Sequence, residues 1–223
     1  MKPVQPCRTV IIADITWFRK LFKVCAVRSA HLKKNILWFE TPDEKIERYR
    51  YARLRLEEAG FEILAVVIDG RRGVRDIFAD LPVQMCQFHQ IQIVNRYITS
   101  RPKLEASIEL KWVVMVLCQS TETEFNQKLT EWHNKWGEFI KERTTDPFTG
   151  RWHFTHKRLR SAYRSLNSNL PYLFTYLKYP ELNIPNTTNS LDGYFSHLKD
   201  LIGIHRGLNR KMKQKLIDEI MGK

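Results

Sequence analysis

The chain has 223 residues, with 37 Lys or Arg against 24 Asp or Glu, which gives a net charge of +13 at pH 7 when the histidines are neutral. Its hydrophobic fraction of 43% can build a core, which excludes a wholly disordered chain, and no apolar stretch is long enough to cross a bilayer. The four cysteines contain no C-x-x-C pair, so a disulfide framework is not indicated and a soluble, intracellular protein is expected.

Apolar runs and turn residues predict an α/β core in the first hundred residues. Short β-branched or apolar runs indicate strands, and one helix has a start signal in Thr41-Pro42 and a stop signal in Gly60. In chain order we expect strands over Thr9–Ile15, Leu21–Val27 and Ile36–Glu40, a helix over Pro42–Ala59, strands over Phe61–Ile68 and Val83–Gln87, and a helix over His89–Ile98.

Helical spacing replaces the strand signals from Lys103 to about Tyr179. Its clearest apolar stripe is Phe125, Leu129, Trp132, Trp136 and Phe139, which we assign to a core. A polar linker follows, and then a closing helix that begins near Thr187 or Thr188, with a basic tail after it. We therefore expect core residues 1–100, an all-α insertion over 101–182, and the closing helix and tail over 183–223.

Two acids, Asp14 and Asp69, lie near the ends of apolar strands that can be parallel neighbours. Sites of open α/β sheets lie beyond the carboxyl ends of the strands, where both acids would fall. Neighbouring carboxylates repel each other unless a divalent ion neutralises them, although each Asp could instead cap a loop or the next helix. Asp192, on the first turn of the closing helix, is the candidate for a third ligand, or else only a favourable charge at a helix N-terminus.

Four motifs follow one another along the chain. They are Ile12–Phe18 around the first acid, Val67–Gly73 around the second, Cys86-Gln87-Phe88-His89, and Asn186–Lys199 around the third. In this order, and with a long helical stretch before the last acid, the chain resembles the DDE transposases of the mutator-like superfamily, in particular its bacterial insertion-sequence members. The third motif looks like the C-x-x-H motif of that family.

The resemblance implies an α/β protein with a ribonuclease H-like mixed sheet core and a large all-helical insertion before the last catalytic helix. It implies that Asp14, Asp69 and Asp192 are catalytic and hold two Mg²⁺ (or Mn²⁺) ions, with Asp14 bridging both. The reaction would be metal-dependent DNA cleavage and strand transfer of an insertion sequence, in which one ion activates water or a 3′-hydroxyl and the other stabilises the leaving oxygen.

Two features depart from the family pattern. The third position is usually Glu, and Asp192 is one methylene shorter, so we expect either a closing helix that lies nearer the other acids or a reduced activity. We also find no N-terminal region of the kind that recognises the ends of the element, so a truncated transposase is expected.

The basic residues gather at the two ends of the chain. Met1 to Glu40 has 8 Lys or Arg against 2 Asp or Glu, and Arg151 to Lys223 has 13 against 5. This distribution favours nucleic acid, the transposon ends and target DNA, over a membrane surface. The predicted DNA-binding residues are Arg71, Arg72, His89, Arg158, Arg160, Lys199, His205 and Arg206. The resemblance further implies a bacterial cytoplasmic, nucleoid-associated protein that forms a homo-oligomer on DNA.

Two other functions fit the same residues. The chain could be an inactive remnant that binds DNA without cutting it, or a ribonuclease H-like nuclease or integrase that uses the same acids on another substrate. Metal-dependent nicking separates the active enzymes from the remnant, and strand transfer separates a transposase from a nuclease. The Cys86 and His89 pair offers only two of the four ligands that a structural zinc site needs. We therefore expect Cys86 to be a buried strand residue and His89 to start a helix near the active site, where it could contact DNA or orient a catalytic group.

Overall fold

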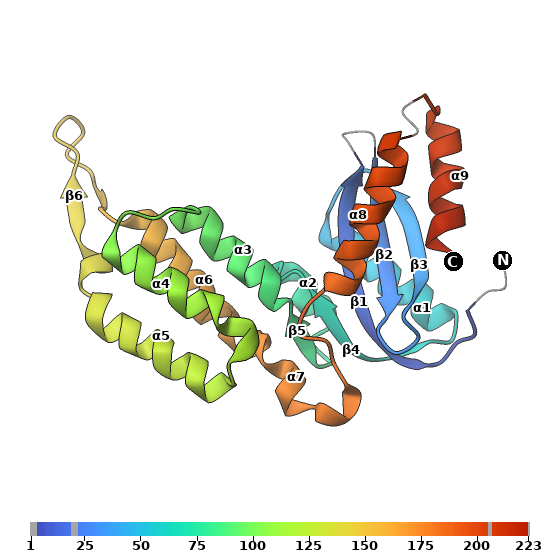
Figure 1. Ribbon diagram of the computed structural model, residues 1–223, viewed down its shortest axis with the longest axis horizontal. Helices are drawn as coiled ribbons and strands as arrows, with labels where there is room; N and C mark the ends of the chain where they lie inside the picture. Colours follow the sequence, from blue (N-terminus) through green and yellow to red (C-terminus); the bar gives the residue numbers. More distant parts are fainter. Residues whose placement is uncertain (1–3, 19–21, 205–206, 223) are drawn as a thin grey trace. The chain divides into compact units, whose positions relative to one another are not determined.

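The structure is a computed structural model that describes residues 4–18, 22–204 and 207–222 (Figure 1). The chain divides into two compact units. The sheet unit runs to Cys86 and resumes at Thr175, and the helical unit is Gln87–Phe174. The helical unit thus begins and ends earlier than the expected bounds of 101 and 182.

Hydrogen bonds explain where the two units divide. Gln87 Nε2 donates to the carbonyl of Leu173 at 2.9 Å, and Asn169 Nδ2 donates to Gln90 Oε1 at 2.7 Å, so the segment after Cys86 already packs within the helical unit. At the other end, Thr175 Oγ1 donates to the carbonyl of Val83 at 2.7 Å. The chain from Thr175 onward is therefore part of the sheet unit.

A five-stranded mixed sheet forms the centre of the sheet unit, in the order β3-β2-β1-β4-β5. The strands β1, β2 and β3 pair antiparallel, whereas β4 pairs parallel with β1 and β5 pairs parallel with β4. Their bounds are β1 Arg8–Phe18, β2 Phe22–Ser29, β3 Lys34–Thr41, β4 Glu62–Ile68 and β5 Val83–Met85. The expected α/β class and the parallel pairing of the two acid-bearing strands are confirmed.

Helices cover both faces of this sheet (Figure 1). Side chains alternate along a strand, and Val10 and Ile12 of β1 face the closing helix α8, where Leu191 and Phe195 pack in the same buried cluster. The other face carries α1, which buries Tyr49 against the strands. The helices of the unit are α1 Ile46–Glu58, α2 Arg72–Ile77, α7 Thr175–Lys178, α8 Asn189–Ile204 and α9 Arg210–Met221, with a 3₁₀ turn over Pro180–Leu182.

The first helix starts later than expected. We expected Pro42 as its first residue and Thr41 as its N-cap, but α1 begins at Ile46 after Lys45. The Thr41 hydroxyl instead donates to the carbonyl of Asp43 at 3.0 Å, and the Asp43 carboxylate accepts from the amide of Lys45 at 3.1 Å. Because these bonds satisfy the backbone in a turn, the helix begins four residues later.

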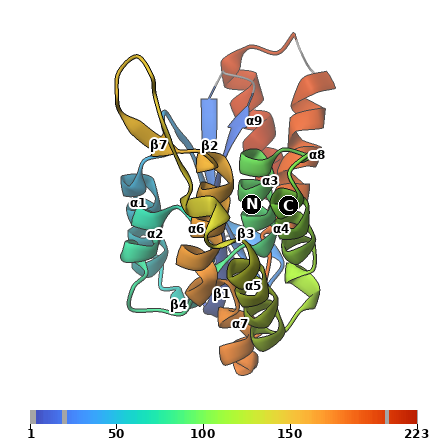
Figure 2. The same cartoon turned by 90° about the vertical axis from the view of Figure 1, so that its left-hand side faces the viewer.

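Four helices and a hairpin make up the helical unit (Figure 2). Phe125, Leu129 and Trp132 of the predicted stripe are buried, while Trp136 and Phe139 are half-buried. We did not expect the hairpin, because its strands are three residues long and mostly polar. The elements are α3 Gln87–Ile98, α4 Glu105–Met115, α5 Glu122–Trp136, β6 Arg143–Thr145, β7 Trp152–Phe154 and α6 Lys157–Leu173, with 3₁₀ turns over Leu117–Gln119 and Phe139–Lys141. Of the helices in the described ranges, none combines the length and the apolar composition needed to span a membrane.

Candidate active site

The parallel register aligns the first two acids. Ile12 of β1 pairs with Val67 of β4, and Asp14 and Asp69 each follow two residues later. Asp14 shares the strand face of Ile12, which is the face that α8 covers. Both acids are half-buried. They therefore lie level with each other on neighbouring parallel strands, at the edge predicted from the sequence.

Asp14 is not the end of its strand. β1 continues to Phe18 because it stays paired with β2 as far as the Phe18–Phe22 pair, whereas its parallel pairing with β4 ends at Ile12–Val67. The acid thus lies where β1 loses β4 as a neighbour and keeps β2. A strand that is still paired on one side holds the Asp14 backbone more firmly than a loop would.

Tyr49 of α1 is close enough to both acids to feel their charge. Burial raises the pKa of its hydroxyl well above the ordinary value, and the negative charges of Asp69 and Asp14 raise it further. Burial also raises the pKa of the Cys25 thiol, with a smaller contribution from Asp14. Sequence reasoning missed Tyr49, since one Tyr on the apolar face of a helix carries no distinguishing signal.

A chain of contacts ties the third acid to the same end of the sheet. The Thr188 hydroxyl donates to Asp192 Oδ2 at 2.7 Å, and the Thr188 amide donates to Cys86 Sγ at 3.3 Å. The amide of Cys86 in turn donates to the carbonyl of Ile68 at 2.8 Å, one residue before Asp69. The start of α8 is thereby anchored beside the end of β4, and the cysteine of the C-x-x-H motif is the link.

The donor set of these acids suits a hard divalent cation, because Mg²⁺ and Mn²⁺ prefer carboxylate oxygens. Among the residues that the structure describes, no group of three or more His, Cys, Asp or Glu side chains is arranged to hold one metal ion. The three carboxylates thus lie at one end of the sheet without forming a shared cluster in this conformation.

Replacing Thr188 by valine should destabilise the start of α8. Thr188 is fully buried, and valine keeps its shape but loses the hydroxyl that donates to Asp192. We expect the free energy of unfolding to fall by about 1–2 kcal/mol, measured by urea denaturation. Thr188→Ser, which keeps the hydroxyl, is the matched control, and equal losses in both variants would show that the bond to Asp192 does not matter.

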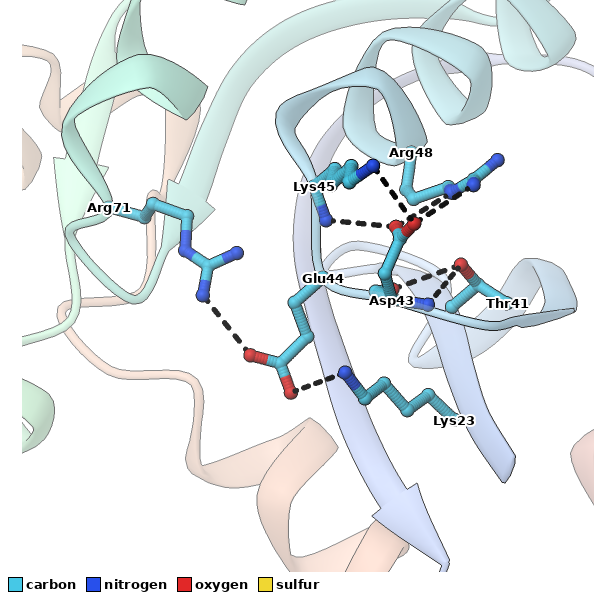
Figure 3. A network of polar contacts seen from close by, with 7 residues as sticks. All are labelled: Lys23, Thr41, Asp43, Glu44, Lys45, Arg48 and Arg71. Atoms are coloured by element: carbon cyan, nitrogen blue, oxygen red, sulfur yellow. Dashed lines mark hydrogen bonds and ion pairs between the residues drawn. The ribbon is translucent and has the colours of Figure 1, made fainter. Parts of the chain in front are cut away.

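Arg71 bonds to two acids, Asp69 and Glu44, and Figure 3 shows the pairing with Glu44. Its amide donates to Asp69 Oδ1 at 3.2 Å, and its guanidinium donates to Glu44 Oε2 at 3.1 Å. The other oxygen of Glu44 lies 3.8 Å from Lys23 Nζ, and that ammonium lies over the Trp17 ring at 3.7 Å. Glu44 therefore pairs with two cations, Lys23 and Arg71.

A second acid in Figure 3 fixes the start of α1. Asp43 accepts from Arg48 Nε at 3.0 Å and from Arg48 Nη2 at 3.2 Å. These bonds, with the bond from the Lys45 amide, lower the pKa of Asp43 from 3.8 to about 2. This pair therefore fixes the start of the helix that carries Tyr49, the residue whose pKa both Asp69 and Asp14 raise.

The Asp43–Arg48 pair predicts a pH dependence of stability. The folded pKa is depressed, so the pair stabilises fully above about pH 4 and its contribution is lost as the pH falls through about 2. The difference in melting temperature between wild type and Asp43→Asn should therefore shrink from pH 4 to pH 2, measured by thermal unfolding. A constant difference over that range would contradict the assignment.

The predicted DNA-binding residues are spread over both units. Lys199 is exposed on α8, and Arg72 is the first residue of α2. His89, Arg158 and Arg160 belong to the helical unit, where Arg158 Nη2 donates to the carbonyl of Arg96 at 2.8 Å and the Arg160 guanidinium lies 3.9 Å from the centre of the Phe154 ring. His205 and Arg206 lie outside the described residues.

The chain matches no model of a known protein family and has no significant similarity to any curated protein sequence. Its function therefore has to be inferred from the motif order in the sequence and from the placement of the acids on the sheet.

Proposed function

We propose that this chain is the catalytic part of a DDE-type transposase that cleaves DNA strands and transfers them in a metal-dependent reaction. The observation that carries the proposal is the level placement of Asp14 and Asp69 on parallel strands β1 and β4. Two half-buried carboxylates on neighbouring strands repel each other, and a bound divalent ion would relieve that repulsion.

The architecture supports the ribonuclease H-like fold that the motifs imply. The mixed sheet comes first in the chain, the helical unit follows β5, and α8 closes the sheet unit with Asp192 on its first turn. The contacts of Cys86 with Thr188 and Ile68 give the cysteine of the C-x-x-H motif a structural role, because they hold the start of α8 beside the end of β4.

Each residue of the site has a role in the proposed reaction. Asp14, Asp69 and Asp192 would hold two Mg²⁺ ions, which when bound supply an activated hydroxyl and a positive charge at the leaving oxygen. Thr188 orients Asp192, and the Arg71 amide orients Asp69. Lys199, exposed on α8, can bind a DNA phosphate. The proposed protein would act as a homo-oligomer on DNA in a bacterial cytoplasm.

The deciding experiment combines cleavage with joining. Wild-type protein is incubated in Mg²⁺, Mn²⁺ or EDTA with a duplex that carries the inverted repeats flanking its coding region, together with a supercoiled target plasmid. Metal-dependent nicks and joined products would support a transposase. Nicks without joining would favour a nuclease of the same fold, and intact DNA in both metals would leave a remnant that only binds DNA.

A further inference from the structure

Charge is segregated within the helical unit. The segments Arg96–Lys103 and Lys141–Arg164 together contain ten Lys or Arg and two acids, whereas Glu105–Trp136, which covers α4 and α5, contains three Lys and five Glu. Both acids of the basic segments have partners: Glu142 Oε2 lies 3.1 Å from His156 Nε2, and Asp146 accepts from the amides of its own turn. The two basic segments therefore present uncompensated positive charge.

A pocket of about 480 Å³ lies between these two segments. Its lining includes Arg101, Lys103, Lys157 and Arg158, and no Asp or Glu is among its thirteen described lining residues. Arg101, Lys103 and Lys157 are exposed, and within the described part of the chain none of the three makes an ion pair. A concave surface with free cations and without acids attracts anions more strongly than scattered surface charge does.

The β6–β7 hairpin leads into this pocket, because Thr155 and His156, which follow β7, line it. The hairpin projects beyond the helices of the unit (Figure 2). The amide of Thr155, a lining residue, donates to the carbonyl of Glu142 at 2.9 Å, and His156, another lining residue, stacks on Phe139 with ring centres 3.8 Å apart. The base of the hairpin is thus fixed to the wall of the pocket.

The tip of the hairpin is built to expose an aromatic ring. Asp146 accepts from the amides of Phe148 at 2.8 Å and Thr149 at 2.9 Å, and these bonds lower the pKa of its carboxyl. Phe148 is 96% exposed on this ordered turn. Lower on the hairpin, Trp152 is half exposed, with the Arg143 guanidinium 4.1 Å from its ring centre.

We propose that the pocket and the hairpin form one nucleic-acid-binding surface of the helical unit, in which Arg101, Lys103 and Lys157 bind backbone phosphates and Phe148 stacks on a base. Cations alone would accept any polyanion, but exposed aromatic rings beside cations are the combination that binds nucleic acid strands. This inference rests on the proposed function only in that DNA is the partner; it uses none of the three carboxylates.

The test measures DNA binding by the full chain in EDTA. Fluorescence anisotropy gives the affinity for a labelled duplex and for a labelled single strand, both of arbitrary sequence. Lys103→Glu should weaken binding to both by about tenfold at 0.1 M salt, because one phosphate contact is lost. The slope of log affinity against log salt should become shallower by about 1. Phe148→Ala should weaken single-strand binding by about fivefold or more without changing that slope, because stacking is not electrostatic.

Lys128→Glu is the matched control, since it makes the same change of charge on α5, in the acidic part of the helical unit. It should change affinity by less than about twofold, because it lies away from the phosphate contacts. Equal losses in Lys103→Glu and Lys128→Glu would overturn the proposed surface, as would unchanged single-strand binding in Phe148→Ala. Because the assay contains EDTA, its outcome is separate from any failure of the cleavage assay.

Discussion

Replacing Asp14 by asparagine is expected to reduce metal-dependent DNA cleavage by at least about 10³-fold. Asp14 is the acid on the central strand, level with Asp69, and an amide could not supply the anionic oxygen with which Asp14 would hold Mg²⁺ in the proposed reaction. A loss of about 4 kcal/mol of transition-state stabilisation corresponds to this factor. The measurement is the rate of plasmid nicking in Mg²⁺ and in Mn²⁺.

The melting temperature of Asp14→Asn shows whether a loss of cleavage comes from the missing carboxylate or from unfolding of the variant. Asparagine is nearly isosteric with aspartate, so Asp14→Asn should still unfold in one cooperative transition, measured by thermal unfolding. Asp76→Asn is the matched control, because Asp76 is exposed on α2. Its cleavage rate should equal that of wild type. Full cleavage activity in Asp14→Asn would contradict the proposed role of Asp14 in the reaction.

Replacing Phe195 by alanine is expected to destabilise the sheet unit by about 3–5 kcal/mol, since a large buried ring leaves both lost contacts and a cavity. Phe195 of α8 is 2% exposed and packs in the cluster with Ile12 and Val67, the residues that lead to the first two acids. Urea denaturation should report the loss as a lower midpoint. The same change therefore also loosens the helix that carries Asp192.

The same substitution at an exposed ring is the control for Phe195. Phe148→Ala removes an equally large side chain that is 96% exposed, so its free energy of unfolding should stay within about 0.5 kcal/mol of the wild-type value. A small effect at Phe195, comparable with that at Phe148, would mean that α8 does not depend on this core.

Periodicity and sequence order predicted the strands of the sheet and the edge at which Asp14 and Asp69 lie. The apolar runs before each acid are long enough to specify buried strands, and the connection between them, which is β2, β3 and α1, is long enough to allow parallel pairing. The apolar face of α8 was equally visible, with Leu191, Phe195 and Leu198 at helical spacing. In each case neighbours along the chain carry the signal.

Contacts between residues far apart in the chain could not be predicted from the sequence in this way. The Thr188 amide bonds to Cys86 across about a hundred residues, and Glu44 reaches both Lys23 and Arg71, so no local pattern marks these pairs. The signal for α1 was misleading, because Thr41 and Asp43 satisfy each other in a turn instead of capping a helix. The hairpin was missed because strands of only three residues are too short to show a period.

The hydrogen bond between Thr175 and Val83 has a consequence for how this protein can vary. The chain leaves the sheet unit after Cys86 and re-enters it at Thr175, where the hydroxyl holds the carbonyl of Val83 and the amide of Tyr176 donates to Gln84 Oε1 at 3.0 Å. The points at which the chain leaves and re-enters the sheet unit are thus adjacent. The segment between them can therefore lengthen, shorten or be exchanged with little change in the entropy cost of closing the loop. Selection can therefore change the helical unit while the strands that lead to Asp14 and Asp69 stay fixed.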